Sequence, residues 1–196
     1  MGFAVGLAMN GMRPVVEMQF DAFAYPAFEQ VVSHVAKLGN RTRGAVRMPM
    51  VIRVPFGGGI GGVEHHCDSS EAYYAHTPGL TVVCPATPQD AYSMLRAAIE
   101  SPDPVVVLEP KKLDWSKGPG ATYVGEPGGV GRTRGGWSAV PGMSYGSSVQ
   151  IALDAAAVAE SEGRGVRVVD VRTLTPCDDD TIFAAVRATG RAIVVA

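Results

Sequence analysis

The sequence has few cysteines, no long apolar segment and almost no excess of charge of either sign. Its three cysteines, Cys67, Cys84 and Cys177, are odd in number and show no CxxC spacing. They indicate neither a disulfide framework nor a zinc site and favour a reducing compartment, the cytoplasm. No run approaches the roughly 20 apolar residues needed to cross a bilayer. A net charge of −2 gives no electrostatic reason to expect a nucleic acid or an anionic membrane as partner.

The composition is typical of one large globular domain, or of one domain with part of another. The 196 residues are 46% hydrophobic and include 24 glycines and 14 prolines, which is too apolar for a disordered chain. Met1 is followed at once by a helical pattern that lacks the basic region of a signal peptide, and the final AIVVA stops inside a predicted strand. We therefore expect the chain to be cut at both ends.

Strands that alternate with helical patterns predict the α/β class. A helix is predicted over residues 3–12, with Phe3, Leu7 and Met12 as its apolar side chains and Gly11 at its end. Further strands are predicted over residues 15–20, 50–56, 80–86 and 104–110, and further helices over residues 22–38, 70–75 and 88–100. Near-continuous apolar strands separated by helices describe a parallel sheet that is covered by helices on both faces.

Residues 111–146 have no sustained period and are rich in glycine and proline, so we expect a linker or an irregular crossing segment. Beyond them a helix, a strand over VRVVDVRTL, a helix that opens at Asp178 and the strand AIVVA follow. These elements are too few to close a second covered sheet. The predicted division is residues 1–112 as the first domain, 113–146 as linker and 147–196 as an incomplete second α/β domain.

Two features at the end of the 50–56 strand favour a functional site. The GGGIGG run at 57–62 fits neither a P-loop nor a dinucleotide-binding fingerprint, so it is interpreted either as a phosphate loop or as a loop that lets a surface or a cofactor come close. His65 and His66 follow it, and one of them is a candidate proton carrier. The alternatives are two solvent-facing histidines, or a zinc site completed by His76 or Asp68.

Two carboxylates near apolar strands remain open to two interpretations. Glu17 lies within VVEMQF and Glu109 ends VVVLEP. Each is either paired in a buried network or faces a site, because an unpaired buried charge is costly. No GxSxG motif is present, so the sequence does not support a serine hydrolase.

The runs GFAVGLAMNGMRPVVEMQFDAFAYPAFEQVVSHVAKL and MPMVIRVPFGGGIGGVEHHCDSSEAYYAHTPGLTVVCPATPQDAYSMLRAAIESPDPVVVLEPK closely resemble the beta subunit of thiamine-diphosphate-dependent 2-oxo acid dehydrogenases. The resemblance covers about residues 2–112 and returns in VRVVDVRTLTPCDDDTI. EMQFDAFAYPAF and LEPKKLDW favour the branched-chain type. The family implies a transketolase-like pyrimidine-binding domain and a transketolase C-terminal domain, the latter incomplete here.

The resemblance also implies partners and chemistry. Beta and alpha subunits of the family form an α2β2 heterotetramer with thiamine diphosphate between them. They decarboxylate a 2-oxo acid and pass the acyl group to lipoamide on a dihydrolipoyl acyltransferase core. Alternatives are a pyruvate or acetoin dehydrogenase beta subunit, and an inactive fragment that retains only the subunit-interface fold.

By the same resemblance, Phe23 would stack on the aminopyrimidine ring, Gln19 would lie beside it, and His66 would be the active-site histidine. The family also has a structural potassium site, whose oxygens would come here from Met50, Val51, Ala98, Ile99, Ser101 and Asp103. Ser101 stands where many relatives have an acid. The family's cofactor-activating glutamate precedes the GFA segment, so this sequence lacks it.

Overall fold

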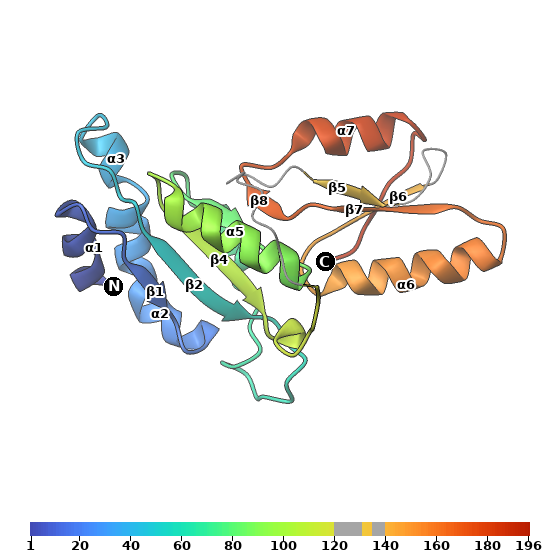
Figure 1. Ribbon diagram of the computed structural model, residues 1–196, viewed down its shortest axis with the longest axis horizontal. Coiled ribbons are helices and arrows are strands. Elements are labelled where there is room, and N and C mark those ends of the chain that lie inside the picture. Colours follow the sequence, from blue (N-terminus) through green and yellow to red (C-terminus); the bar gives the residue numbers. More distant parts are fainter. Residues whose placement is uncertain (120–130, 135–139) are drawn as a thin grey trace.

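Two sheets form the scaffold of the computed structural model, which describes residues 1–119, 131–134 and 140–196 (Figure 1). The five-stranded sheet has the order β1 (Val15–Glu17), β2 (Val51–Phe56), β4 (Val105–Pro110), β3 (Thr81–Val83), β8 (Thr173–Thr175). The four-stranded sheet has the order β5 (Arg132–Arg134), β7 (Val166–Asp170), β6 (Val140–Ser144), β9 (Ile193–Val194).

Helical segments join these strands. They are α1 (Gly2–Met9), α2 (Asp21–Gln30), the π-helical turn η1 (Val31–Val35), α3 (Leu38–Arg41), α4 (Glu71–Ala75), α5 (Pro88–Glu100), the 3-10 turn η2 (Lys111–Leu113), α6 (Ser148–Ser161) and α7 (Asp179–Arg187). Within the part of the chain that is described, none of these helices combines the length and the apolar character needed to cross a membrane.

Strands β2, β4 and β3 of the first sheet are largely buried on both faces, as their β-branched residues predict, whereas the edge strand β1 is mostly exposed. β1, β2, β4 and β3 run parallel, and Ile52 pairs with Val106 while Val51 pairs with Val105. Alternate residues point to opposite faces of a strand. Ile52 and Val106 therefore join the core beneath α1, α2 and η1, whereas Val51 and Val105 join the core beneath α5. The predicted parallel sheet covered by helices is confirmed.

Helix boundaries follow local chemistry where a cap or a turn residue is present. The Thr87 hydroxyl accepts a hydrogen bond from the Asp90 amide at 3.1 Å, and Pro88 occupies the first turn of α5, as the Thr-Pro pair predicts. The helix predicted over residues 22–38 begins as α2 and continues as η1, where the Ala36 amide donates to the Val31 carbonyl. Helix α1 is found and ends before Gly11, whose φ is +85°.

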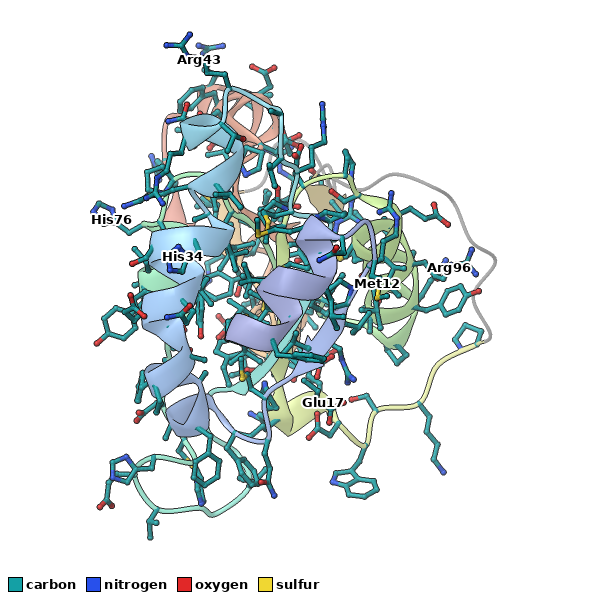
Figure 2. The ribbon with its side chains drawn as sticks, turned by 90° about the vertical axis from the view of Figure 1, so that its left-hand side faces the viewer. Met12, Glu17, His34, Arg43, His76 and Arg96 are labelled. Carbon is teal, nitrogen blue, oxygen red and sulfur yellow. The ribbon has the colours of Figure 1, made fainter. Side chains whose placement is uncertain are left out.

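Two of the three apolar side chains that mark the first helix in the sequence are exposed. Phe3 and Met12 are 83% and 56% exposed, whereas Ala4 and Ala8 are buried. The small side chains let α1 approach the sheet closely, so the alanine face packs into the core and the large side chains point outward. Figure 2 shows α1 in front of the sheet and beside α2, with Met12 following it.

The second sheet contains strands that the sequence pattern misassigned. The strand predicted over VRVVDVRTL is two strands, because Arg172 adopts a φ of +52° and turns the chain. β7 stays in the second sheet, while β8 pairs antiparallel with β3 of the first. β6 lies within the predicted linker. Residues 120–130 and 135–139 of that linker lie outside the described part.

Helices α6 and α7 lie on opposite sides of the second sheet (Figure 1). Val168 packs under α6 with Val149 and Ala152, and the adjacent Val169 packs under α7 with Ala185. β9 is an edge strand that pairs with β6. A strand is therefore found within AIVVA, but its side chains are exposed, with Val194 at 74%.

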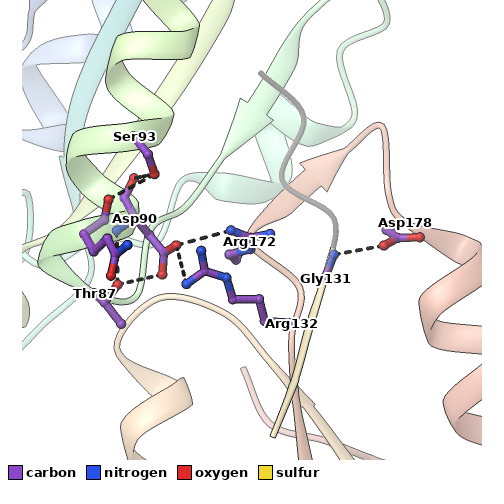
Figure 3. Close-up of polar contacts among 8 residues, drawn as sticks. Thr87, Asp90, Ser93, Gly131, Arg132, Arg172 and Asp178 are labelled. Carbon is purple, nitrogen blue, oxygen red and sulfur yellow. Dashed lines mark hydrogen bonds and ion pairs between the residues drawn. The ribbon is translucent and has the colours of Figure 1, made fainter. Parts of the chain in front are cut away.

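The fully buried carboxylate of Asp90 joins the part of the chain that forms the first sheet to the part that forms the second (Figure 3). Asp90 of α5 accepts a hydrogen bond from Thr87 at 2.6 Å and lies 3.2 Å from the Arg172 guanidinium and 3.1 Å from that of Arg132. Both arginines come from the second half of the chain. Their charges offset the cost of burying the carboxylate, so this contact fixes how β5 and β8 meet α5.

Candidate functional site

The candidate site is the loop that follows β2, together with the start of α2. The Gly57 amide donates to the Asp68 carbonyl at 2.7 Å and closes the base of the loop. In Figures 1 and 2 this loop lies at the lower end of the first sheet, near the first turn of α2. Both elements lie at the carboxyl ends of parallel strands, where open α/β sheets present functional groups.

One position of the loop requires glycine because the backbone there lies close to a neighbouring side chain. Gly59 has a φ of +106°, and a Cβ placed there would lie 2.8 Å from the Lys112 Cβ. The loop backbone therefore rests against η2, at the end of β4. This favours the interpretation of GGGIGG as a loop that permits close contact.

His66 lies among aromatic rings. Its imidazole stacks on the Phe20 ring at a centroid distance of 4.5 Å and an angle of 24°, and the Phe23 ring lies 5.8 Å away. The His66 Nδ1 is buried and has no hydrogen-bond partner among the described residues. The Phe23 ring is 56% exposed. The structure thus brings the predicted pair His66 and Phe23 together and leaves an open aromatic surface beside them.

Gln19 is exposed and directly precedes Phe20, so it lies in the same segment as the aromatic cluster. The sequence did not single out Phe20. The only available signal was its spacing from Phe23, because two aromatic residues three apart at a helix start lie on one side of the chain.

Two contacts on either side of His66 attach the loop to α2. The Ala22 amide donates to the His65 carbonyl at 3.3 Å, and the Tyr25 hydroxyl donates to the Asp68 Oδ2 at 2.6 Å. This hydrogen bond, with a smaller contribution from burial, raises the pKa of Tyr25 to about 12. Tyr25 therefore keeps its proton and remains a donor at neutral pH.

Glu17 and Glu109 are explained by pairing. Arg53 lies between them in the sheet, with its Nε 2.7 Å from the Glu109 Oε1 and its Nη1 2.6 Å from the Glu17 Oε2. The Glu109 contact has two hydrogen bonds, and that pairing is the main reason the pKa of Arg53 is raised. Both glutamates are therefore paired, but the expected burial is found only in part, because the Glu17 side chain is 65% exposed whereas that of Glu109 is 25% exposed.

The zinc interpretation finds no support. No three His, Cys, Asp or Glu side chains gather closely enough to hold a metal ion among residues 1–119, 131–134 and 140–196. His76 points outward at the side of the molecule, away from the loop that carries His66 (Figure 2).

Comparisons with known proteins match both halves of the chain. Residues 1–114 match the family described as "Transketolase, pyrimidine binding domain", and residues 143–196 match "Transketolase, C-terminal domain". The chain belongs to the transketolase pyrimidine-binding family. Its relatives include beta subunits of 2-oxo acid dehydrogenases, as the sequence resemblance implies.

Two such relatives have names that specify different 2-oxo acids. A "3-methyl-2-oxobutanoate dehydrogenase subunit beta" of Mycobacterium tuberculosis is 50% identical over 99% of this chain and 56% of that protein. A "Pyruvate dehydrogenase E1 component subunit beta" of Leifsonia xyli is 48% identical over 98% of this chain and 58% of that protein. The chain thus spans little more than half the length of these relatives.

A solved structure titled "Split gene transketolase, inactive beta4 tetramer" matches with a TM-score of 0.80 and 25% identity, over the whole of this chain and 61% of that one. It confirms the transketolase-like α/β fold.

The cofactor of this family is thiamine diphosphate, and the aromatic cluster fits part of it. The exposed Phe23 ring offers a flat face to an aromatic ring, and the His66 Nδ1 is a buried polar atom that lacks a partner among the described residues. Phe23 of α2 and His66 of the loop therefore present an exposed ring and, among the described residues, an unpaired polar atom of the kind that a pyrimidine ring would contact.

The carbonyls assigned to potassium do not fit a metal ion as they are placed. The Arg13 guanidinium donates to the Ile99 carbonyl at 2.9 Å and to the Ser101 carbonyl at 2.6 Å. The Met50 carbonyl accepts from the Val105 amide within the sheet. A positive charge thus already lies at two of the assigned oxygens. Asp103 pairs with Arg47 at 3.6 Å.

Proposed function

We propose that the chain is part of the beta subunit of a branched-chain 2-oxo acid dehydrogenase. The proposed reaction is oxidative decarboxylation of a 2-oxo acid with transfer of the acyl group to lipoamide. The observation that carries the proposal is the His66 ring stacked on Phe20 beside the open face of Phe23. The relative at 50% identity, whose name specifies 3-methyl-2-oxobutanoate, supports the branched-chain substrate.

Each residue of the cluster has a proposed role. Bound thiamine diphosphate supplies the electron sink for decarboxylation. Phe23 stacks on its pyrimidine ring and Gln19 lies beside that ring. Phe20 supports the His66 imidazole, which exchanges a proton with the substrate and helps pass the acyl group onward.

The proposal includes partners. An alpha subunit shares the cofactor in an α2β2 assembly, and a dihydrolipoyl acyltransferase core receives the acyl group. The free thiols of Cys67, Cys84 and Cys177 support a reducing compartment, and we place the protein in the cytoplasm. Potassium is not part of the proposal, because the Arg13 guanidinium holds two of its assigned carbonyls.

The test uses the full-length subunit assembled with its alpha subunit. His66→Ala is expected to lower acyl transfer to lipoamide by roughly 100-fold or more, the usual contribution of a positioned proton carrier. His76→Ala, an exposed histidine on another side of the chain, serves as the control and stays near wild type. Normal acyl transfer by His66→Ala would show that the assigned role is wrong.

A second candidate is a pyruvate dehydrogenase beta subunit, which the 48% identical relative favours. The ratio of kcat/KM for 2-oxoisovalerate to that for pyruvate separates the two. A value well above one supports the branched-chain proposal, whereas a large preference for pyruvate selects the alternative. Turnover of neither substrate by the assembled enzyme would favour a subunit that retains only the interface fold.

A further inference from the structure

The segment between Gly57 and Asp68 combines a strained backbone with two attachments to α2. His65 has a φ of +73°, a left-handed conformation that a residue with a side chain rarely adopts. Such a conformation persists only where the surrounding contacts hold it. His65 directly precedes His66, so whatever holds His65 also sets the direction of the His66 side chain.

Three of the contacts on this segment, all close to His66, come from α2 and the residue that precedes it. The Ala22 amide binds the carbonyl of His65, the residue before His66. The Tyr25 hydroxyl binds Asp68, two residues after His66. Phe20, which directly precedes α2, supplies the stacking surface. The start of α2 therefore contacts the segment before, at and after His66.

Tyr25 is itself held in place. Its ring meets the Tyr73 ring edge to face at 6.4 Å, and Tyr73 in turn lies 5.9 Å from Phe28, one turn further along α2. The hydroxyl thus extends from a ring with a restricted direction. A donor fixed in this way loses little conformational freedom when it forms the bond to Asp68.

We propose that Tyr25 and Asp68 form a tether that positions His66. The inference rests on the proposed function, because it concerns the histidine that acts there. Tyr25 is a positioning residue: it touches neither His66 nor the open face of Phe23 in any contact that the structure gives, and it acts through Asp68 and the loop backbone. Without the tether, the Asp68 side chain no longer attaches the loop to α2, and only the Gly57 amide still holds the Asp68 carbonyl, so the His66 ring loses its fixed place on Phe20.

The first experiment measures the tether without turnover. Hydrogen exchange followed by mass spectrometry on the full-length assembled protein reports the amides of residues 57–68. Tyr25→Phe removes only the donor, and exchange in this segment is expected to rise about fivefold, as for the loss of one partly exposed hydrogen bond. Tyr92→Phe, which removes an exposed hydroxyl on α5, is the matched control and leaves the segment unchanged.

A second set of variants separates the tether from general damage. Asp68→Asn keeps an acceptor oxygen and is expected to retain most of the protection, whereas Asp68→Ala matches Tyr25→Phe. The double variant Tyr25→Phe/Asp68→Ala is no worse than either single change, because each removes the same contact. Independent, additive increases in exchange would overturn the pairing.

Kinetics test the consequence for His66. Tyr25→Phe is expected to lower kcat for lipoamide acylation about fivefold while KM for the 2-oxo acid and thiamine diphosphate affinity change less than twofold. Exchange within twofold of wild type in residues 57–68 of Tyr25→Phe overturns the inference, whatever the enzyme does. Increased exchange with unchanged acylation kcat also overturns it. If the wild-type assembly turns over no 2-oxo acid, the proposed function fails, and the exchange result still decides whether the tether exists.

Discussion

The Lys111 ammonium lies 2.9 Å from the Asp21 Oδ2, and both side chains are buried, at 2% and 0% exposure. Lys111 follows β4 and Asp21 is the first residue of α2. Their ion pair therefore fixes the start of α2, the helix that carries Phe23, against the end of β4 in the first sheet. An acidic residue in the first turn also suits the positive end of the helix dipole.

Removing one partner of this pair is expected to be costly. Lys111→Met leaves a buried carboxylate without its counter-ion, and we expect the free energy of unfolding to fall by about 3 to 5 kcal/mol. Urea denaturation of the assembled protein measures the loss.

The neighbouring Lys112→Met is the control, because Lys112 is exposed, and its effect stays within about 0.5 kcal/mol. Adding Asp21→Asn to Lys111→Met should recover part of the loss. A loss below about 1 kcal/mol for Lys111→Met would contradict a structural role for the pair.

Two glycines are expected to respond in opposite directions to alanine. A Cβ at Gly79 would lie 1.9 Å from the Ala36 carbonyl oxygen, and its φ is +100°. Gly79→Ala forces the backbone to move and should cost about 2 kcal/mol or more. Gly6 lies within α1 with nothing near its Cβ position, so Gly6→Ala should add about 0.5 to 1 kcal/mol. Thermal unfolding of both variants measures the contrast, and equal effects would refute the close contact at Gly79.

The stabilisation from Asp178 is expected to depend on pH. Asp178 caps α7 and accepts hydrogen bonds from the Thr181 and Gly131 amides. Bonding to Thr181, above all, lowers the pKa of Asp178 below its usual value. A carboxyl whose pKa is lower in the folded state stabilises the fold above its unfolded pKa, and this contribution is lost as the pH falls through the folded pKa.

The matched variant for this test is Asp178→Asn, which keeps a capping oxygen but carries no charge. Its stability deficit relative to wild type should be largest at pH 7 and should shrink once the pH falls below the unfolded-state pKa of about 3.9, because the wild-type carboxyl then loses its charge as the pH approaches its lowered folded pKa. Asp178→Ala, which removes the cap altogether, should cost about 1 kcal/mol at pH 7. Unfolding at pH 7, 5 and 3 measures both, and a deficit of Asp178→Asn that grows on acidification would reverse the assigned sign.

Local patterns predicted the elements whose signals lie within a few residues. The β-branched run at 51–54 and the Thr87-Pro88 start of α5 determine their conformations almost independently of the rest of the chain. The turn at Arg172 gave no such signal, because VRVVDVRTL contains no glycine or proline and its valines continue on both sides of Asp170. Likewise, the large apolar residues mark the first helix in the sequence, but the residues that α1 buries are the small Ala4 and Ala8.

The site was predictable only in part for the same reason. His66 follows a glycine run at a strand end, and that placement marks it as a candidate. The groups that hold it come from distant positions. Asp21 and Lys111 are 90 residues apart and Tyr25 and Asp68 are 43 apart, so no local spacing relates them. Such pairs become visible only when the sheet brings α2, the loop and η2 together.

We expect the Arg13 guanidinium to stabilise the backbone carbonyls at the C-terminal end of α5, in the place of a metal ion. Its guanidinium donates to the Ile99 and Ser101 carbonyls, 86 and 88 residues away. Arg13→Leu removes both bonds and should lower the free energy of unfolding by about 1 to 2 kcal/mol.

Denaturation in potassium chloride and in tetramethylammonium chloride at equal ionic strength then distinguishes a cation effect from screening. In Arg13→Leu, potassium should restore stability that tetramethylammonium does not, because a small cation can occupy the carbonyls left by the guanidinium. The wild type should respond little to the exchange of cations. An equally large potassium effect in the wild type would show that the metal binds beside Arg13, and the guanidinium would then not be its replacement.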